Sequence, residues 1–444
     1  RSNKIVLVGT IRIEMKERLL IHSAKQIVQV VSNGEKRLTG EDMKHLAILN
    51  ASEGSGCSLI VNSHGKIEFI GHDEDLQEAK CHWEFEEMID ATDMCVIPGF
   101  VDAHTHPVWA GDRVHEFAMK LAGATYLDVH KSGGGINFTV NHTRQATEEE
   151  LYESFQERLG NMLKTGSTTV ECKTGYGLDK DTEIKMLKVL KRGRRELSND
   201  ISITYLGAHS VPQGMTADQA VDDIIDNQLP EIQKLIVSGE IDVDNIDVFC
   251  EQGVFDVAQS RRILEAGRQM NLKLNFHGEE LHQIGGAEMG ASLKAEAISH
   301  LEEISQEGMA AMAASGTVAV ILPTTAYILR LKPPPVRDMI GMNIPVALGS
   351  DFNPNAYCMS MPTVMNLACI TCNMTMPEAL AAATINAAAS LGRADDVGSL
   401  EVGKFGDLIV LDAPRWEHVI YRMSDDSNLI KCVVKKGSVV YKRH

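Results

Sequence analysis

Apolar segments of strand length alternate with amphipathic segments of helix length through the middle of this 444-residue chain, and this alternation restricts the fold more than any other feature. It predicts eight strands, at Val96–Ala103, Ser167–Glu171, Ile201–Gly207, Asn245–Phe249, Leu272–Phe276, Ala295–Ser299, Thr317–Leu322 and Pro345–Gly349. The helices predicted between them include Glu148–Lys164, Lys180–Glu196, Ala217–Val237, Ala258–Met270 and Glu302–Ser315. Alternating strands and helices form a mostly parallel sheet, and eight repeats favour a closed (β/α)8 barrel. An open dinucleotide-binding sheet is disfavoured, since no G-x-G-x-x-G follows a strand.

Both ends of the chain are rich in short β-like runs separated by turn signals. The clearest runs near the start are Ile5–Val8, Ile27–Val31, Ser58–Val61 and Ile67–Ile70. Near the end, Gly403–Leu411 is a turn that leads into an apolar strand, and Ile430–Lys435 and Ser438–Tyr441 form a predicted hairpin. We predict that the two ends pair into one small β-sandwich domain. Its N-terminal part spans residues 1–96, the barrel spans 97–397, and the C-terminal part of the small domain spans 398–444.

Charge and cysteine usage restrict the partners and the compartment. The chain has 61 acidic and 43 basic residues, a formal net charge of −18, which disfavours nucleic acid and anionic membranes as partners. Its nine cysteines are scattered and odd in number, as expected in a reducing compartment. The uncharged stretch Gly308–Leu329 is interrupted by Pro323 and several Ser and Thr residues, so we interpret it as buried. We expect a cytoplasmic protein.

The ends of the predicted strands carry an unusual number of polar side chains, and chemistry in such barrels collects at those ends. Four of the eight strand ends carry histidine. The polar residues at these ends are Asp102, His104 and His106; Glu171, Lys173 and Tyr176; His209; Glu251; His277, Glu279 and Glu280; His300; and Ser350, Asp351 and Asn353. Together they predict one functional site.

A metal centre is the first prediction from this set. Alternate residues of a strand point the same way, so His104-Thr105-His106 places two imidazoles on one face. His277 and Asp351, at the ends of the fifth and eighth strands, complete three imidazoles and a carboxylate. Such a set suits a divalent cation such as zinc or iron, with a position left for a solvent-derived ligand.

The predicted chemistry is activation of water. A divalent cation with an open coordination position lowers the pKa of bound water and polarises a carbonyl. Asp351 or Glu280 can accept the proton of the attacking water and return it to a leaving nitrogen. Hydrolysis of an amide-like C–N bond is the expected reaction class.

The other polar strand ends are candidate substrate contacts. Arg113 can hold a carboxylate bidentately, or it can simply pair with Glu116 as a surface ion pair. Tyr176, His209 and His300 can form hydrogen bonds around a planar ring. For the two histidines the alternative is a buried ring that is satisfied by backbone groups.

These residues resemble a known family. Pro98-Gly-Phe-Val-Asp-Ala-His-Thr-His-Pro107 is similar to the first-strand signature of the amidohydrolase superfamily, and Gly398–Leu411 is similar to its return to the small β domain. The joint set of motifs resembles the imidazolonepropionase family more narrowly: His104–Arg113, Glu171–Leu178, Leu206–Pro212, Asn275–Glu280 and Gly349–Pro354.

The resemblance implies a ring-opening hydrolase of histidine degradation that converts 4-imidazolone-5-propanoate, a small anionic substrate, into N-formimidoyl-L-glutamate. It implies a homodimer and one zinc or iron ion per chain, held by His104, His106, His277 and Asp351. It also implies catalytic roles for Glu280, His300 and Asp351. The implied substrate contacts are Arg113, Tyr126, Tyr176, His209, Glu280, Asn353, Asn355 and Ala356. Many relatives carry glycine and a small hydroxyl residue where this chain has Asn355 and Ala356.

Two other functions are compatible with the same residues. A nucleobase deaminase would share the metal ligands but would need no arginine for a propionate tail. A non-catalytic barrel that serves as a scaffold would have no need of stoichiometric metal, and it should have lost a ligand, whereas all four ligands are present in this chain.

Overall fold

The computed structural model describes residues 15–79, 83–123 and 134–443. The predicted strand Ile5–Val8 lies outside these residues. Within them, no helix combines the length and the apolar character needed to cross a membrane.

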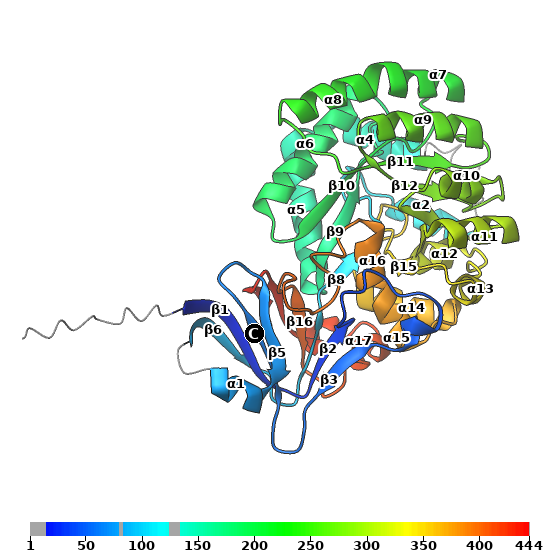
Figure 1. Ribbon diagram of the computed structural model, residues 1–444. Coiled ribbons are helices and arrows are strands. Elements are labelled where there is room, and N and C mark those ends of the chain that lie inside the picture. Colours follow the sequence, from blue (N-terminus) through cyan, green and yellow to red (C-terminus); the bar gives the residue numbers. More distant parts are fainter. Residues whose placement is uncertain (1–14, 80–82, 124–133, 444) are drawn as a thin grey trace, which may run out of the picture.

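The middle of the chain forms the predicted eight-stranded parallel barrel (Figure 1). Its strands are β8 (Phe100–Asp102), β9 (Ser167–Lys173), β10 (Asp200–Ala208), β11 (Asn245–Cys250), β12 (Lys273–Gly278), β13 (Ala297–His300), β14 (Val318–Ile321) and β15 (Val346–Leu348), paired in chain order. The first and last strands close the ring through backbone hydrogen bonds from Ala103 N to Leu348 O (3.4 Å) and from Asp351 N to His104 O (2.9 Å). The second of these bonds joins two predicted metal ligands.

The predicted first strand, Val96–Ala103, is divided between two sheets. Residues Cys95–Pro98 form β7 of a terminal sheet, and β8 begins the barrel only at Phe100. Gly99 is the point of division. A larger residue would not fit there, because a Cβ would lie 2.2 Å from Oγ1 of Thr168 on the neighbouring strand. The hydrophobic run is continuous in sequence, so its periodicity could not reveal the break.

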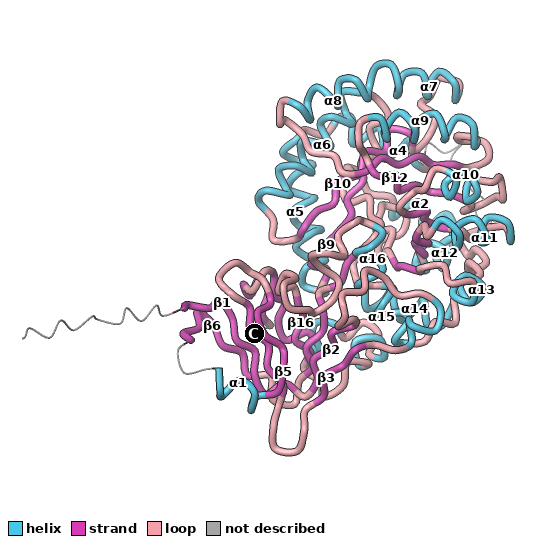
Figure 2. The backbone as a smooth tube through the Cα atoms, viewed as in Figure 1, coloured by secondary structure: helices cyan, strands magenta, loops and turns pink. Residues whose placement is uncertain are grey.

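Helices surround the barrel (Figure 2). They are α2 (Val114–Leu121), α4 (Ile136–Gln145), α5 (Glu148–Lys164), α6 (Lys180–Glu196), α7 (Ala217–Asp223), α8 (Leu229–Val237), α9 (Val257–Gln269), α10 (Gly286–Ser292), α11 (Gln306–Ser315), α12 (Pro323–Leu329), α13 (Val336–Gly341), α14 (Met361–Thr371), α15 (Met376–Ala382) and α16 (Ile385–Ser390). α5 begins at a capping box: the Thr147 side chain accepts a hydrogen bond from Glu150 N, and the Glu150 side chain accepts one from Thr147 N. The helix buries Leu151, Phe155 and Leu159. The predicted bounds of α5 and α6 are confirmed.

Two predicted helices differ in detail. The segment Ala217–Val237 contains a π-helical turn, Ile224–Gln228, between α7 and α8. Pro230 follows this turn and has no N–H to give to a regular α-helical bond, which favours the wider turn. α11 begins at Gln306 rather than Glu302, because Ser305 caps it by accepting a hydrogen bond from Gly308 N. The residues before it form the loop that follows His300.

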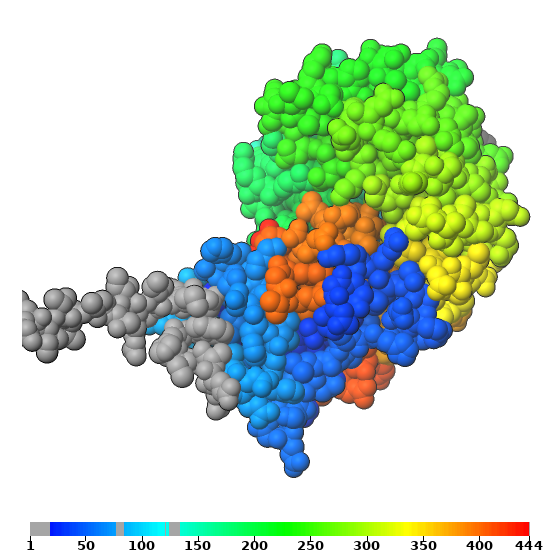
Figure 3. All heavy atoms as spheres, viewed as in Figure 1, coloured from blue at the N-terminus to red at the C-terminus, as the bar shows by residue number. Residues whose placement is uncertain are grey.

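Both termini contribute to the small β domain, as predicted: one of its sheets joins strands from both ends of the chain, and the other has N-terminal strands alone. Figure 3 shows the blue N-terminal part lying against orange segments of the C-terminal part. One sheet has the order β18-β17-β16-β7-β2-β3 and the other β5-β4-β1-β6. The strands are β1 (Met15–Ala24), β2 (Gln26–Val30), β3 (Ala47–Asn50), β4 (Cys57–Val61), β5 (Ile67–His72), β6 (Trp83–Asp90), β16 (Leu408–Leu411), β17 (Ile430–Lys435) and β18 (Ser438–Lys442). Short helical elements accompany them: η1 (Gly40–Lys44), α1 (Asp73–Ala79), α17 (His418–Tyr421) and α18 (Asp426–Leu429). β1, β3 and β6 were not predicted.

The two terminal sheets pack face to face around one apolar cluster, to which Leu19 and Val61 contribute from one sheet and Val96 and Val410 from the other. The domain is joined to the barrel by a buried ion pair. Lys435 of β17 pairs with Asp407 and, at 2.7 Å, with Asp200 at the start of β10. This contact lies at the N-terminal end of a barrel strand, away from the predicted site.

Candidate active site

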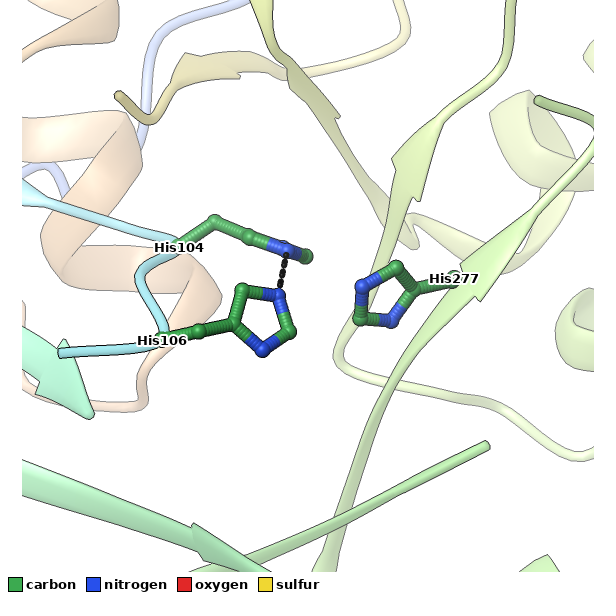
Figure 4. A group of neighbouring side chains, drawn as sticks. All are labelled: His104, His106 and His277. Carbon is green, nitrogen blue, oxygen red and sulfur yellow. Dashed lines mark hydrogen bonds between the residues drawn. The ribbon is translucent and has the colours of Figure 1, made fainter. Parts of the chain in front are cut away.

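Three histidines from two strands face one another at the C-terminal end of the barrel (Figure 4). His104 and His106 follow β8, and His277 belongs to β12 across the barrel. One ring nitrogen from each of the three lies within 4.8 Å of the other two. The Nε2 atoms of His104 and His106 are 3.2 Å apart. All three side chains are buried.

Asp351 completes the set predicted as metal ligands. Its Oδ1 atom lies 3.5 Å from Nε2 of His104 and 3.5 Å from Nε2 of His106. Two ligands about 2.0–2.1 Å from one ion in tetrahedral geometry are roughly 3.3 Å apart, so these separations fit a shared cation. Among the described residues, Oδ1 of Asp351 is buried and has no hydrogen-bond partner. A buried carboxylate oxygen without a partner is costly, and a cation between these four side chains would satisfy it.

The imidazoles are in the protonation state that metal binding requires. Burial lowers the pKa of His104, His106 and His277 well below the ordinary value, so each ring is neutral at neutral pH. Hydrogen bonds also orient two of the rings: Nδ1 of His104 contacts Oγ of Ser299 at 2.8 Å, and Nδ1 of His277 contacts the carboxylate of Asp247 at 2.9 Å. Because Nδ1 of each ring is bonded in this way, Nε2 of both rings faces the proposed metal position.

Asp247 and Ser299 were not predicted as site residues. A signal for Asp247 was present, since Asn245 and Asp247 are alternate polar residues within a buried strand and therefore share one face of β11. Polar residues that face a barrel interior need partners there. We found no comparable sequence signal for Ser299.

A cavity of about 770 Å3 opens above the three histidines. It brings together most of the predicted site residues, which come from distant parts of the chain. The predicted residues that line it are His106, Arg113, Tyr176, His209, His277, Glu280, His300, Asp351, Asn353 and Asn355. His104 lies below the cavity floor, fully buried. Tyr126 lies outside the described residues.

Glu280 and His300 form a charged pair on the wall of the cavity. Nε2 of His300 is 3.7 Å from Oε2 of Glu280. Burial raises the pKa of Glu280 to about 7. Burial by itself would lower the pKa of His300, but the carboxylates of Glu280 and Glu302 raise it to about 10. The wall therefore carries one group suited to proton exchange near neutral pH and one suited to donating a hydrogen bond.

The backbone is strained where these side chains enter the cavity. His300 has φ 80° and Asp351 has φ 48°, both in the left-handed region that non-glycine residues rarely adopt. Each such residue costs about 1–3 kcal/mol and is typical of functional sites. Both side chains line the cavity.

His209 presents a neutral ring to the same cavity. Its Nδ1 atom lies 3.0 Å from the carbonyl oxygen of Gly175, and its ring stacks on His106 with centroids 4.8 Å apart. Burial lowers the pKa of His209 to about 4. Because a neutral Nδ1 must donate to the carbonyl, Nε2 is the acceptor. His209 is thus a buried histidine with one nitrogen bonded to the backbone, which was the alternative to a substrate contact, and its ring also lines the cavity.

The loop that carries Tyr176 is held by a buried carboxylate. Glu183 accepts hydrogen bonds from the backbone N–H groups of Gly175 (3.2 Å), Gly177 (2.8 Å) and Leu178 (2.9 Å). These bonds fix the loop after β9. Tyr176 is buried, and its ring centroid lies 5.3 Å from that of His209.

Arg113 forms the ion pair with Glu116 that the sequence analysis left open, and it also lines the cavity. Its Nε and Nη2 atoms donate to Oε2 of Glu116 at 2.9 and 2.7 Å. The other oxygen of Glu116 accepts from Gly135 N at 2.8 Å. Glu116 therefore anchors the guanidinium at the edge of the cavity, which is consistent with a second carboxylate binding there.

The loop after β15 holds itself together around Asn353. The side-chain oxygen of Asn353 accepts from the backbone N–H groups of Asn355 (2.7 Å) and Ala356 (3.0 Å), and its amide donates to Asp351 O (2.7 Å). Asn353 and Asn355 line the cavity, whereas Ala356 is fully buried beside them and is not among the lining residues. The loop shape thus depends on the Asn353 side chain.

Comparison with known proteins identifies close relatives over nearly the whole chain. A sequence model described as the amidohydrolase family matches residues 95–440. The chain is 58% identical to a probable imidazolonepropionase from Nematostella vectensis, with 96% of this chain and 100% of that protein covered. It is also 58% identical to a probable imidazolonepropionase from Bos taurus, with 96% and 99% covered.

Solved structures share the fold at much lower identity. An adenosine deaminase from Xanthomonas campestris, determined with bound zinc, superposes with a TM-score of 0.67 at 16% identity, covering 97% of this chain and 94% of that one. At that identity the likeness supports the architecture alone.

Proposed function

Because the chain belongs to the amidohydrolase family, we propose that its cavity hydrolyses the ring amide C–N bond of 4-imidazolone-5-propanoate to give N-formimidoyl-L-glutamate. The observation that carries this proposal is the convergence of His104, His106, His277 and Asp351 at the floor of one cavity that Glu280 also lines. The proteins named probable imidazolonepropionases, which match 96% of the chain, support the choice of substrate.

The four converging side chains are the proposed ligands of one zinc or iron ion per chain. Three neutral imidazole nitrogens and one carboxylate oxygen are a donor set that both metals accept. When bound, such an ion supplies Lewis-acid polarisation of the ring carbonyl and makes a water molecule more acidic.

Glu280 is the proposed proton carrier, and Asp351 is kept as a ligand. Oδ2 of Asp351 already accepts a hydrogen bond from Thr325, and Oδ1 faces the two histidines. Glu280 accepts a proton from the water whose oxygen bonds to the ring carbonyl carbon, and it delivers that proton to the ring nitrogen as the C–N bond breaks. His300 donates a hydrogen bond to the carbonyl oxygen as negative charge develops on it.

The remaining cavity residues are the proposed substrate contacts. Arg113 binds the propionate carboxylate. Nε2 of His209 accepts a hydrogen bond from an N–H group of the imidazolone ring, and the Tyr176 hydroxyl donates one to a heteroatom of that ring. Asn353 and Asn355 also line the cavity, and Ala356 is buried beside them. Tyr126 is a further proposed contact from the sequence resemblance.

Removal of metal is expected to abolish the reaction. With purified protein, the absorbance of the imidazolone should fall as formimidoylglutamate forms. Dialysis against a chelator should reduce the rate at least about 100-fold, since the metal supplies several kcal/mol of charge stabilisation. Zinc or iron(II) should restore the rate. Full activity in metal-free protein would contradict the proposal, and protein that holds no stoichiometric metal would favour the scaffold alternative.

Arg113→Ala is expected to raise KM for imidazolone propionate about 10–100-fold with a smaller change in kcat, because a hydrogen bond between charged groups contributes roughly 1.5–3 kcal/mol. The measurement is steady-state kinetics of the variant. Glu148→Ala, an exposed change on the outer helix α5, is the control and should leave KM unchanged. An unaltered KM in Arg113→Ala would favour a nucleobase deaminase.

Added salt is expected to leave kcat/KM unchanged or modestly higher. The net charge of −18 repels an anionic substrate, and raising ionic strength from about 0.05 to 0.5 M screens that repulsion. The initial rate at subsaturating substrate across this range measures the effect. A steep fall would mean that the local field at the cavity is attractive enough to outweigh the net charge.

We further propose that the protein acts in the cytoplasm as a homodimer, with a small molecule as its only ligand class. The eight described cysteines are all free, as expected in a reducing compartment. Sedimentation velocity of the purified protein measures the oligomeric state, and a monomer at micromolar concentration would contradict the dimer.

A further inference from the structure

A buried charged network lies directly beneath the metal-ligand set. Nζ of Lys173, on β9, is 2.8 Å from Oδ2 of Asp247, on β11, and 2.8 Å from Oε1 of Glu171. All three side chains are fully buried. The same Glu171 oxygen accepts a hydrogen bond from Oγ1 of Thr204 at 2.6 Å.

This network ends on one of the proposed metal ligands. Asp247 contacts both the backbone N of His277 (3.1 Å) and its ring Nδ1 (2.9 Å). Asp247 accepts a hydrogen bond from the Nδ1–H group of His277, and this bond fixes the tautomer of the ring. Nε2 then faces His104 and His106, and Figure 4 shows the ring in this orientation. The orientation of Asp247 therefore decides the orientation of the ligand.

Lys173 is the group that holds Asp247 in that orientation. Burial by itself lowers the pKa of Lys173, but the carboxylates of Asp247 and Glu171 raise it above its ordinary value, so the ammonium group is charged. A buried carboxylate that loses its cationic partner turns toward other donors. This change in orientation would release the hydrogen bond to His277.

We propose that Lys173 is a positioning residue of the metal centre, which acts on His277 through Asp247 and does not touch the substrate. This inference rests on the proposed function, since it assumes that His104, His106, His277 and Asp351 bind a metal ion. It assigns a role to the lysine of the Glu171-Cys172-Lys173 segment, which the substrate and metal contacts leave without one.

The test is zinc affinity of the metal-free protein, measured by competition with a chromogenic chelator. Lys173→Met keeps the length of the side chain and removes its charge. We expect zinc to bind it about 10–100-fold more weakly than the wild type, the usual effect of losing an outer partner of a metal ligand. A purely electrostatic role predicts the opposite sign, because K173M leaves more negative charge near the cation and would tighten binding.

Glu171→Gln is the matched control. It disturbs the same buried network on the side away from His277 and keeps the pair of Lys173 with Asp247. Zinc affinity of E171Q should stay within about threefold of the wild type, even if its melting temperature falls as far as that of K173M. Equal losses of affinity in both variants would mean that the network only stabilises the fold, and would overturn the proposal.

The double variant K173M/E171Q covers the case in which K173M alone does not fold. It removes one cation together with one carboxylate, so the charge near the centre stays as in the wild type. Weaker zinc binding in this variant isolates the lost hydrogen bond to Asp247, and wild-type affinity would overturn the proposal. The absorption spectrum of the cobalt(II)-substituted proteins should change in both Lys173 variants and stay unchanged in E171Q.

Failure of this inference can be separated from failure of the proposed function. A wild-type protein that binds no zinc at stoichiometric amounts would contradict the metal centre itself. A wild-type protein that binds zinc and opens the imidazolone ring, together with K173M that binds zinc as tightly, would contradict only the role of Lys173.

Discussion

Asp351→Asn is expected to lower kcat/KM for imidazolone propionate by roughly three orders of magnitude or more. Asp351 lies 3.5 Å from both His104 and His106 and is the only carboxylate of the proposed ligand set. The amide has the same shape but no charge, so it binds a divalent cation poorly, and the chemistry that the ion supplies is worth several kcal/mol. Steady-state kinetics and zinc content of the purified variant measure the effect.

Asp407→Asn is the matched control for this change. Asp407 and Asp351 are equally buried, each with 4% of its surface exposed, but Asp407 pairs with Lys435 at the junction of the barrel and the small β domain. We expect D407N to lower the melting temperature and to keep kcat/KM and zinc content. Comparable losses of zinc in both variants would show that any lost buried carboxylate disturbs the site, and would remove Asp351 from the ligand set.

Glu280→Gln is expected to lower kcat by about 10²–10⁴-fold, the usual contribution of a positioned proton carrier, with zinc content unchanged. In the wild type, kcat/KM should fall as the pH drops through the pKa of Glu280, which burial raises to about 7, because a protonated carboxyl cannot accept a proton from water. A bound cation moves this limb to lower pH. The limb should be absent from the pH profile of E280Q.

The neighbouring Glu279 provides the control for E280Q. Glu279 is also buried, but its carboxylate accepts hydrogen bonds from the backbone N–H groups of Ile284, Gly286 and Ala287 around the start of α10. Glu279→Gln should reduce stability, since a charged cap at a helix N-terminus is replaced by a neutral one, and should keep kcat. Full turnover in E280Q would remove Glu280 from the proton-transfer role.

Much of the barrel could be predicted from sequence because burial leaves a local periodic signal. The bounds of α5 and α6 and the approximate positions of seven barrel strands follow from hydrophobic spacing and from capping residues such as Thr147 and Asp179. The terminal sheets were harder to predict. β6, Trp83–Asp90, carries four acidic residues among eight, and such a strand gives little apolar alternation.

The division at Gly99 shows where a local signal ends. Val96 and Val101 belong to one hydrophobic run, yet β7 pairs with β16 and β2 while β8 pairs with β9. Pairing partners that lie far apart in the chain decide which sheet a strand joins, and periodicity carries no record of them.

The sequence by itself determined the eightfold alternation and predicted the proposed metal-ligand set, because strand geometry puts His104 and His106 on one face and barrel topology brings His277 and Asp351 to the same end. Only the tertiary structure decided which groups hold the cavity side chains: Asp247 on His277, Ser299 on His104, Lys173 beneath Asp247, and Glu116 on Arg113. Most of these are hydrogen bonds and ion pairs between strands remote in sequence. Their energy depends on burial and on tenths of an ångström, which residue type and spacing do not encode.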